Sequence, residues 1–172
     1  MDLLDESVVP EHARDVKQTA REFADEHVRP NAEEYFESGE YPWEILEAGM
    51  DAGIVAQDIS EEYGGKGYDL QQILAINEEL YRADAGIALT LMLASFGCEI
   101  VEHYGSEEQK EEYLRPVAEN EQISGLAVSE PQTGSDMAGM TTTAEKTDEG
   151  WVLNGEKYWV GNAVEADWLT VY

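Results

Sequence analysis

The sequence is poor in cysteine, histidine and basic residues, and each shortage excludes a class of function. One cysteine, Cys98, stands in 172 residues, so no intrachain disulfide can form, which suits a reducing compartment. His12, His27 and His103 are scattered, so no metal site is expected. The ten Lys and Arg residues are not clustered, so we expect neither nucleic acid nor an anionic membrane surface as a partner.

Long hydrophobic runs are also missing. The longest apolar stretch, Ile87–Phe96, is shorter than the roughly 20 residues that cross a bilayer. No signal peptide precedes it. We therefore expect a cytoplasmic protein without a membrane span.

Acidic residues are abundant. Thirty-eight Asp and Glu residues give a formal charge of −28 and are spread along the whole chain, so they do not form a disordered acidic tail. Two interpretations compete: a halophilic protein, whose self-repulsion is screened in molar salt, or an ordinary acidic protein. The even distribution favours the halophilic one.

The first 120 residues have helical periodicity. Helices are predicted from Pro10 to Arg29-Pro30, from Pro42, over Leu70–Arg82, over Ala85–Tyr104, and from a Ser106–Gln109 capping box to Pro116 or one turn beyond. The Ala85–Tyr104 segment is apolar almost all round, which predicts a helix buried at the centre of a bundle. The glycine-rich loop Tyr63–Gly67 lacks the lysine–hydroxyl pair of a P-loop and is interpreted as a turn.

The pattern changes to strands after Gln122. We expect strands over Ile123–Ser129 and Thr141–Lys146, a turn at Asp148–Gly150, a hairpin that joins Trp151–Leu153 to Glu156–Val160 through Asn154-Gly155, and a strand from Trp168 to Tyr172. The predicted fold is α+β: a helical bundle over 1–120, followed by a partial antiparallel β-domain over 121–172. The sequence stops inside a strand, which suggests a truncated chain or one whose sheet a partner completes.

The most informative segments are Leu126–Asp136 and Trp159–Asn162. In the first, an apolar strand runs into a turn that is rich in hydroxyls and backbone N–H groups, with Gly134 allowing a positive φ or a close approach. In the second, Trp159 at the end of a strand offers an aromatic face. Together they suggest a cofactor with a flat ring and a phosphate tail. The alternative is a hairpin loop of turn-forming residues with a core tryptophan.

The Leu126–Asp136 segment resembles the flavin-binding signature of the acyl-CoA dehydrogenases, and Tyr158–Asn162 resembles their second flavin-contacting segment. Further matches extend the resemblance through the chain, at Gly39–Pro42, Glu62–Gly67, Glu78–Leu80 and His103–Ser106. The chain is thus similar to the N-terminal helical domain and the start of the middle β-domain, without the C-terminal helical domain.

The resemblance implies an FAD-dependent oxidoreductase of fatty acid metabolism that converts acyl-CoA thioesters to trans-2-enoyl-CoA and reduces an electron-transfer flavoprotein. It implies cofactor contacts at Leu126, Val128, Ser129, Gly134, Ser135, Trp159, Val160 and Gly161, with Ser135 also near the substrate. Glu130 matches a structural glutamate of the family. The catalytic base and the main contacts of the family's usual tetramer belong to the C-terminal domain, so this chain alone is expected to be inactive.

Three positions depart from the family pattern. Leu126 replaces a residue that is often aromatic, Ser129 replaces a threonine, and Gly161 stands where many members carry a threonine that bonds flavin N5. The missing hydroxyl at Gly161 keeps an acyl-CoA oxidase open as an alternative. A non-catalytic partner subunit and a helical adaptor that binds nothing at the turn remain further alternatives.

Overall fold

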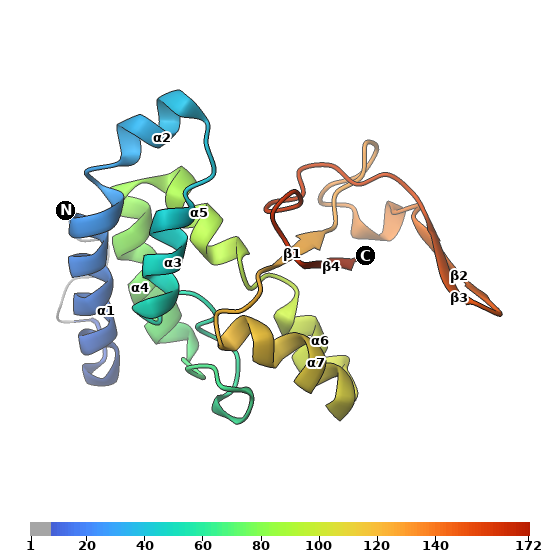
Figure 1. Cartoon of the computed structure of the whole chain (residues 1–172), viewed down its shortest axis with the longest axis horizontal. Helices are drawn as coiled ribbons and strands as arrows, with labels where there is room; N and C mark the ends of the chain where they lie inside the picture. The colour runs from blue at the N-terminus through green and yellow to red at the C-terminus, as the bar shows by residue number, and fades with distance from the viewer. Residues whose placement is uncertain (1–7) are drawn as a thin grey trace.

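The computed structural model describes residues 8–172, which form a helical body followed by a smaller β-region (Figure 1). The helical elements are α1 (Glu11–Phe23), the π-helical turn η1 (Ala24–Val28), α2 (Ala32–Ser38), α3 (Trp43–Asp51), the 3-10 turn η2 (Glu61–Tyr63), α4 (Leu70–Ala83), α5 (Ala85–Leu93), α6 (Cys98–Tyr104) and α7 (Glu107–Ala118). The strands are β1 (Ser124–Ala127), β2 (Thr143–Thr147), β3 (Gly150–Asn154) and β4 (Trp168–Val171), and η3 (Met137–Gly139) is a short 3-10 turn.

Helix boundaries follow local sequence signals. Pro10 precedes α1, and the chain turns at Arg29-Pro30 after η1, as predicted. The capping box of α7 is present: the Ser106 hydroxyl accepts from the Gln109 amide, and the Gln109 side chain accepts from the Ser106 amide. Asp69 and Gln72 form the same motif at α4, where no capping box was predicted. The short helix α2 was likewise not predicted.

The helices α1 and α4 pack together through an apolar stripe and a buried ionic network. Ala20, Phe23, Ala24 and Val28 lie in the core, as their three-four spacing predicts. Beside them, the Lys17 ammonium lies 2.7 Å from Glu78 Oε2, and the Arg21 guanidinium lies 2.9 Å from Glu79 Oε1. Both glutamates are buried, so the cations that face them are needed to compensate their charge.

The predicted single helix Ala85–Tyr104 is wrong in two respects. The segment breaks between α5 and α6, where Gly97 has a φ of +95°, a conformation that favours glycine. It is also not buried all round: Ile87, Leu91 and Cys98 lie in the core, whereas Leu89 and Phe96 are exposed. The apolar side chains of Ala85–Tyr104 therefore lie partly in the core and partly on the exposed surface of the chain.

Ala85–Tyr104 does have the length and composition of a membrane span, contrary to the expectation from its shorter apolar run. Core helices of water-soluble proteins meet the same criterion. Here the α5–α6 break interrupts the helix, and Ala88, Leu91, Ala94 and Cys98 pack into the helical core.

The β-region contains two separate strand pairs. β1 pairs with β4 in parallel, with Gly125 opposite Leu169, and β2 pairs with β3 in an antiparallel hairpin, with Glu145 opposite Val152. The prediction of an α+β chain with helices first is confirmed, but the purely antiparallel sheet is wrong for β1 and β4. The change from helix to strand falls between Ala118 and Ser124. Figure 1 shows the β2–β3 hairpin projecting away from the helices.

The predicted Asn154-Gly155 hairpin does not form, and Glu156–Val160 is not a strand. The hairpin turn lies instead at Asp148-Glu149, inside the predicted Asp148–Gly150 turn. Gly155 serves a different purpose, because a Cβ atom there would overlap the Thr142 side chain. The chain beyond Gly155 therefore leaves β3 and returns toward the end of β1.

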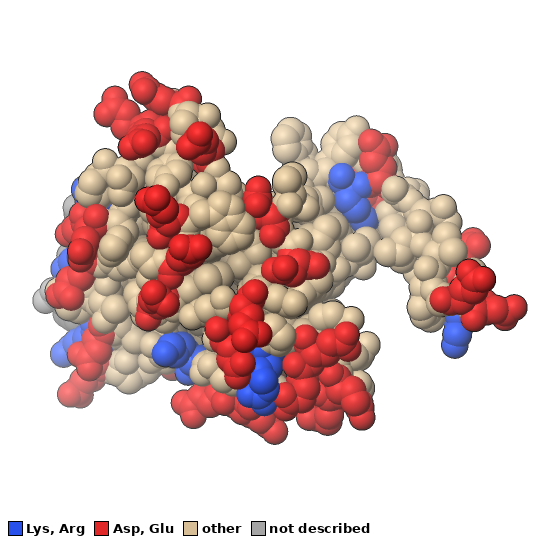
Figure 2. All heavy atoms as spheres, viewed as in Figure 1, with Lys and Arg blue, Asp and Glu red and all other residues tan. Residues whose placement is uncertain are grey.

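Acidic side chains cover much of the molecular face in Figure 2 and gather over α6 and α7. Few basic side chains interrupt them. The exposed acidic residues of α7 include Glu107, Glu108, Glu111 and Glu112. The charge excess of the sequence is thus a property of the surface.

Candidate functional site

The turn after β1 is closed by its own hydrogen bonds. The Glu130 amide donates to the Thr133 carbonyl at 2.9 Å, and the Thr133 amide donates to the Glu130 carbonyl at 3.1 Å. The Thr133 hydroxyl donates to the Asp136 carbonyl. These contacts fix the turn without using Gly134 or Ser135, both of which stay exposed.

Glu130 is the centre of this arrangement. The residue is 5% exposed, and its carboxylate accepts from the Thr141 amide at 2.7 Å, from the Thr142 amide at 2.9 Å and from the Lys157 ammonium at 2.8 Å. The bond from Lys157, with those from Thr142 and Thr141, holds the pKa of Glu130 far below its usual range. A carboxylate that is ionised and saturated in this way is a structural anion and not a proton acceptor.

Lys157 joins the two predicted cofactor-binding segments. Its ammonium also donates to the Val128 carbonyl at 3.0 Å, and the next amide, that of Tyr158, donates to the Ser129 carbonyl at 2.7 Å. The segment Lys157–Gly161 is thereby held beside the end of β1. Lys157 was not among the predicted site residues. Its position directly before Tyr158–Asn162, in a lysine-poor chain, is the local signal for it, whereas its contact with the first segment has no signal in the sequence.

The predicted contact residues of the first segment all reach the molecular surface. Leu126, Val128 and Ser129 are half-buried, and Gly134 and Ser135 are exposed. A Cβ atom at Gly134 would meet nothing within 4 Å, and its φ is not positive, so the closed chain does not itself require glycine there. Among residues 8–172, none bonds the hydroxyls of Ser129 and Ser135 or the amides of Gly134 and Ser135. These groups are open to a ligand.

Trp159 is presented to solvent and not packed in a core. It follows no strand, its side chain is 91% exposed, and its φ of +58° is left-handed, as is the +60° of Asn162. A left-handed tryptophan costs roughly 1–2 kcal/mol. The flanking anchors hold it there: Tyr158 bonds Ser129, and the Asn162 side-chain amide donates to the Thr90 carbonyl at 3.3 Å. Strain of this kind is typical of functional sites.

Gly161 lies against helix α5. A Cβ atom at this position would overlap the Leu93 side chain, so the missing side chain permits close packing between the second segment and α5. Val160 beside it is half-buried. The structure thus gives a packing reason for one of the three departures from the family pattern.

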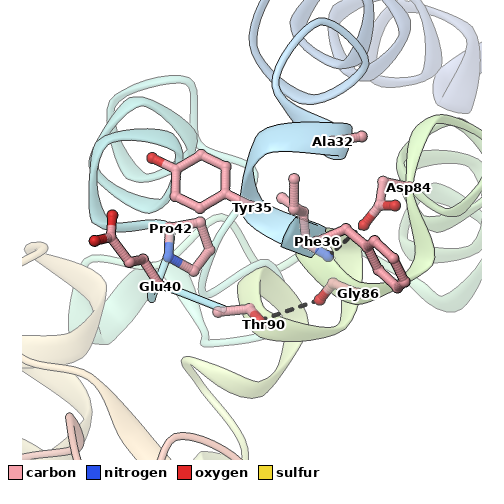
Figure 3. A pocket seen from close by; sticks show the side chains of 9 residues that line it. Ala32, Tyr35, Phe36, Glu40, Pro42, Asp84, Gly86 and Thr90 are labelled. Atoms are coloured by element: carbon pink, nitrogen blue, oxygen red, sulfur yellow. Dashed lines mark hydrogen bonds between the residues drawn. The ribbon is translucent and has the colours of Figure 1, made fainter. Parts of the chain in front are cut away.

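A separate hollow of about 440 Å³ lies between α2 and α5 (Figure 3). Tyr35, Phe36 and Pro42 form apolar walls, with Phe36 87% exposed, and the carboxylates of Glu40 and Asp84 lie at its edge. These two charges repel phosphate groups. The hollow is therefore a poor place for a phosphate-bearing ligand, unlike the turn at Gly134.

Residues 10–121 match the N-terminal domain of acyl-CoA dehydrogenases, and residues 125–172 match the middle domain. The chain belongs to the acyl-CoA dehydrogenase family. The probable medium-chain specific acyl-CoA dehydrogenase 2 of Caenorhabditis briggsae mitochondria is 35% identical over 161 residues, which cover 94% of this chain and 40% of that protein.

Solved acyl-CoA dehydrogenase structures superpose closely on this chain. The glutaryl-CoA dehydrogenase of Mycobacterium smegmatis in complex with FADH2 is 32% identical, with a TM-score of 0.88 over 97% of this chain and 44% of that one. An acyl-CoA dehydrogenase of Bacillus anthracis complexed with FAD is 34% identical, with a TM-score of 0.86 over 99% and 30%. The chain spans about two-fifths of the length of the curated relatives it matches.

The family resemblance inferred from the two motifs is thus confirmed. The individual roles of Leu126, Val128, Ser129, Gly134, Ser135, Trp159, Val160 and Gly161 stay predictions. Among residues 8–172, no group of three or more His, Cys, Asp or Glu side chains is placed to hold a metal ion.

Proposed function

We propose that this chain binds FAD and forms part of a flavoenzyme that dehydrogenates acyl-CoA thioesters at the α,β-bond. One observation supports this above all: Lys157 ties the turn after β1 to the segment that carries the exposed Trp159, so the open donors and the aromatic ring belong to one connected unit. The membership of the family and the FAD-bound relative point to the same ligand.

The residues divide by the chemistry of the cofactor. Leu126 and Val128 offer an apolar wall for the ring, and the Ser129 hydroxyl is open to its polar edge. The amides of Gly134 and Ser135 suit a pyrophosphate, because backbone N–H groups at a turn form an anion-binding concavity. Trp159, Val160 and Gly161 approach from the second segment, and Ser135 extends toward the substrate.

When bound, FAD would supply the hydride acceptor for the substrate β-carbon, and Leu126, Val128, Ser129, Gly134, Ser135 and the Trp159–Gly161 segment would hold it. The residues of this chain orient the ring and keep water from one of its faces. Glu130 is unsuited to remove the α-proton, because its lowered pKa makes it a weak base and its buried oxygens are held by Lys157, Thr141 and Thr142. We expect the base from the part of the relatives that this chain does not match, so the 172 residues alone bind flavin without turning over acyl-CoA.

An acyl-CoA oxidase remains the second candidate. Gly161 has no hydroxyl to offer the flavin, and Leu93 occupies the space that a side chain would need. Oxygen consumption by reduced, flavin-loaded protein separates the two candidates: an oxidase reoxidises within seconds, whereas a dehydrogenase does so slowly.

Family membership and the acidic charge of the chain lead to further proposals about its partners and setting. We propose an acyl-CoA substrate, an electron-transfer flavoprotein as electron acceptor, a homotetramer for the complete enzyme, and a role in fatty acid metabolism in the cytoplasm of a halophile. A non-catalytic partner subunit is the alternative for the chain by itself.

The test is an FAD titration of the purified chain in molar KCl, followed by flavin absorbance and quenching of flavin fluorescence. Gly134→Val is the sharpest variant, since an added Cβ at this position meets no protein atom within 4 Å, while the branched side chain adds bulk directly beside the open amides. We expect saturable binding by the native chain and at least tenfold weaker binding by the variant, with an unchanged circular dichroism spectrum and melting temperature. Equal affinity of the two proteins for FAD would show that FAD does not bind at this turn.

A further inference from the structure

A second cavity, of about 230 Å³, lies away from the turn, between α4, the loop before η2 and the α5–α6 break. Its lining includes Gln57 from the loop, Asn77 from α4, and Met92, Phe96 and Glu99 from the α5–α6 segment. A water molecule takes up about 30 Å³ in the liquid, so the cavity has room for a ligand of several heavy atoms.

Two buried amide oxygens in this lining have no hydrogen-bond partner. Gln57 is 4% exposed; its Nε2 donates to the Ile54 carbonyl and approaches Met92 Sδ at 3.5 Å, which leaves Oε1 unsatisfied. Asn77 Oδ1 is likewise buried and unsatisfied. A buried acceptor without a donor costs roughly 1–3 kcal/mol, so two beside one cavity point to a ligand that donates hydrogen bonds.

The charged side chains that line the cavity are all acidic. Asp58 and Glu99 contribute carboxylates, and the lining residues include no Lys, Arg or His. One Glu99 oxygen accepts from the Gly97 amide at 2.9 Å, which fixes this carboxylate at the α5–α6 break. Partial desolvation, with repulsion from Glu99 and Glu102, raises the pKa of Asp58, although its side chain reaches solvent. The site lacks a positive charge.

The remaining walls are apolar. Ile73, Met92 and Phe96 line the cavity, and Phe96 is 41% exposed at its edge. A ligand that complements the whole cavity has a short hydrocarbon stem and a head that carries positive charge and several N–H donors. A carboxylate head is disfavoured, because it meets two carboxylates and two carbonyl-type oxygens.

We propose that this cavity binds a primary alkylammonium group. The ammonium donates to Gln57 Oε1 and Asn77 Oδ1 and lies near Asp58 and Glu99, while the stem packs on Met92 and Phe96. The group has two possible sources: a free small amine, or the amino-bearing far end of an acyl chain. The second source rests on the proposed function.

The first experiment titrates the chain with n-butylammonium and follows the side-chain amide signals of Gln57 and Asn77 by NMR. We expect saturable shifts of both, with butyrate and 1-butanol at least tenfold weaker. Asn77→Leu and Asp58→Asn should each weaken butylammonium binding at least fivefold. Within residues 8–172 the Asn77 side chain makes no hydrogen bond that the substitution would remove, and Asp58 is exposed, so both variants are expected to fold. Their melting temperatures check this. Asp148→Asn, at the distant hairpin turn, is the charge-matched control and should bind as the native chain does.

Equal binding of the amine and the alcohol, or variants that leave amine binding unchanged, would overturn the proposal. A second arm identifies the source by comparing an ω-aminoacyl-CoA with an unsubstituted acyl-CoA of equal length. If the ω-aminoacyl-CoA binds tenfold more tightly and Asn77→Leu abolishes the difference, the ligand is the end of an acyl chain. If the two thioesters bind equally, the ligand is a free amine. FAD affinity, measured in parallel, reports on the proposed function separately, because the cavity does not include the turn at Gly134.

Discussion

At the scale of single residues, Glu130 shows how one buried charge can organise a binding surface without taking part in chemistry. Its carboxylate ties the end of β1 to Thr141 and Thr142 on one side and to Lys157 on the other. Both predicted cofactor segments therefore depend on one ion pair whose side chains are almost fully buried. Removing either partner leaves the other charge buried without compensation.

The ion pair predicts acid sensitivity. Because the folded-state pKa of Glu130 is depressed, its stabilising contribution is present above the unfolded carboxyl pKa of about 4.3 and is lost as the pH falls toward the folded value. Glu130→Gln should lower the melting temperature by several degrees at pH 7. The difference from the native chain should shrink on acidification below pH 4.

Glu149→Gln is the matched control for this experiment, since Glu149 is an exposed carboxylate at the hairpin turn. Its melting temperature should follow that of the native chain throughout. A constant gap between Glu130→Gln and the native chain from pH 7 to pH 3 would contradict the assigned role of the carboxylate.

Cys98 illustrates a residue whose surroundings suppress its chemistry. It is fully buried in the core, with Sγ 3.5 Å from Ser124 Oγ, and desolvation raises the pKa of its thiol to about 12. Because the thiolate is the reactive form, the native thiol should react with a disulfide reagent at pH 8 at least a hundredfold more slowly than the thiol in denaturant. Fast labelling of the folded chain would show that the core around α6 opens readily.

At the scale of elements, the α5–α6 break couples the helices to the β-region. The Gly97 carbonyl accepts from the Thr170 hydroxyl of β4 at 3.3 Å, and the Ser124 amide of β1 donates to the Ala94 carbonyl at 2.7 Å. A continuous helix would keep the Ala94 carbonyl within its own ladder, whereas at the break this carbonyl is free to accept from β1. The Gly97 carbonyl accepts from the Ile100 and Val101 amides of α6 and takes the Thr170 hydroxyl as a further donor. The break therefore presents both carbonyls to the β1–β4 pair.

Gly97→Ala tests this docking. The substitution meets a φ of +95°, and its Cβ would approach Thr170 Oγ1 to 2.5 Å, so strain and overlap add to an expected loss of about 2–4 kcal/mol in unfolding free energy. Gly39→Ala is the matched control, because Gly39 has a φ of +68° with no atom within 4 Å of the added Cβ. It should lose only about 1–2 kcal/mol by denaturant titration. Equal losses would mean that contact with Thr170 contributes nothing.

Local sequence signals predicted helices and strands correctly where the preference of the residues agrees with the tertiary structure. The Ser106–Gln109 box, the helix end at Arg29-Pro30 and the strands near Ser124 and Thr143 all occur. The failures arise where tertiary contacts override local preference. Asn154-Gly155 is a favoured hairpin pair, but Gly155 is needed for its approach to Thr142, and the α5–α6 break depends on partners in strands far along the sequence.

The candidate flavin site shows the same difference between local features, which the sequence predicts, and long-range contacts, which it does not. The two motifs identified both segments, because each is local in the sequence. The Lys157–Glu130 connection spans 27 residues and became visible only when the segments were seen together. The left-handed conformation and exposure of Trp159 were also not predictable, since they depend on anchors at Ser129 and Thr90.

At the scale of the whole molecule, the formal charge of −28 opposes folding unless it is screened. Most of the acidic groups lie on the surface, and few have basic partners among the ten Lys and Arg residues of the chain. The Debye length falls from about 10 Å at 0.1 M salt to about 3 Å at 1 M, which is shorter than the typical spacing of surface charges. Stability should therefore increase with salt over this range.

We expect the melting temperature to rise by on the order of 10 °C between 0.1 and 1 M KCl, since each kcal/mol shifts it by about 2–4 °C in a chain of this size. The rise should level off beyond 1 M, because screening is then nearly complete at the distances involved. Sodium and potassium chloride should act alike if screening is the cause. A steady increase up to 4 M, or the same increase with sucrose of equal osmolarity, would instead indicate exclusion of solutes from the surface, and the acidic surface would then need another explanation than adaptation to salt.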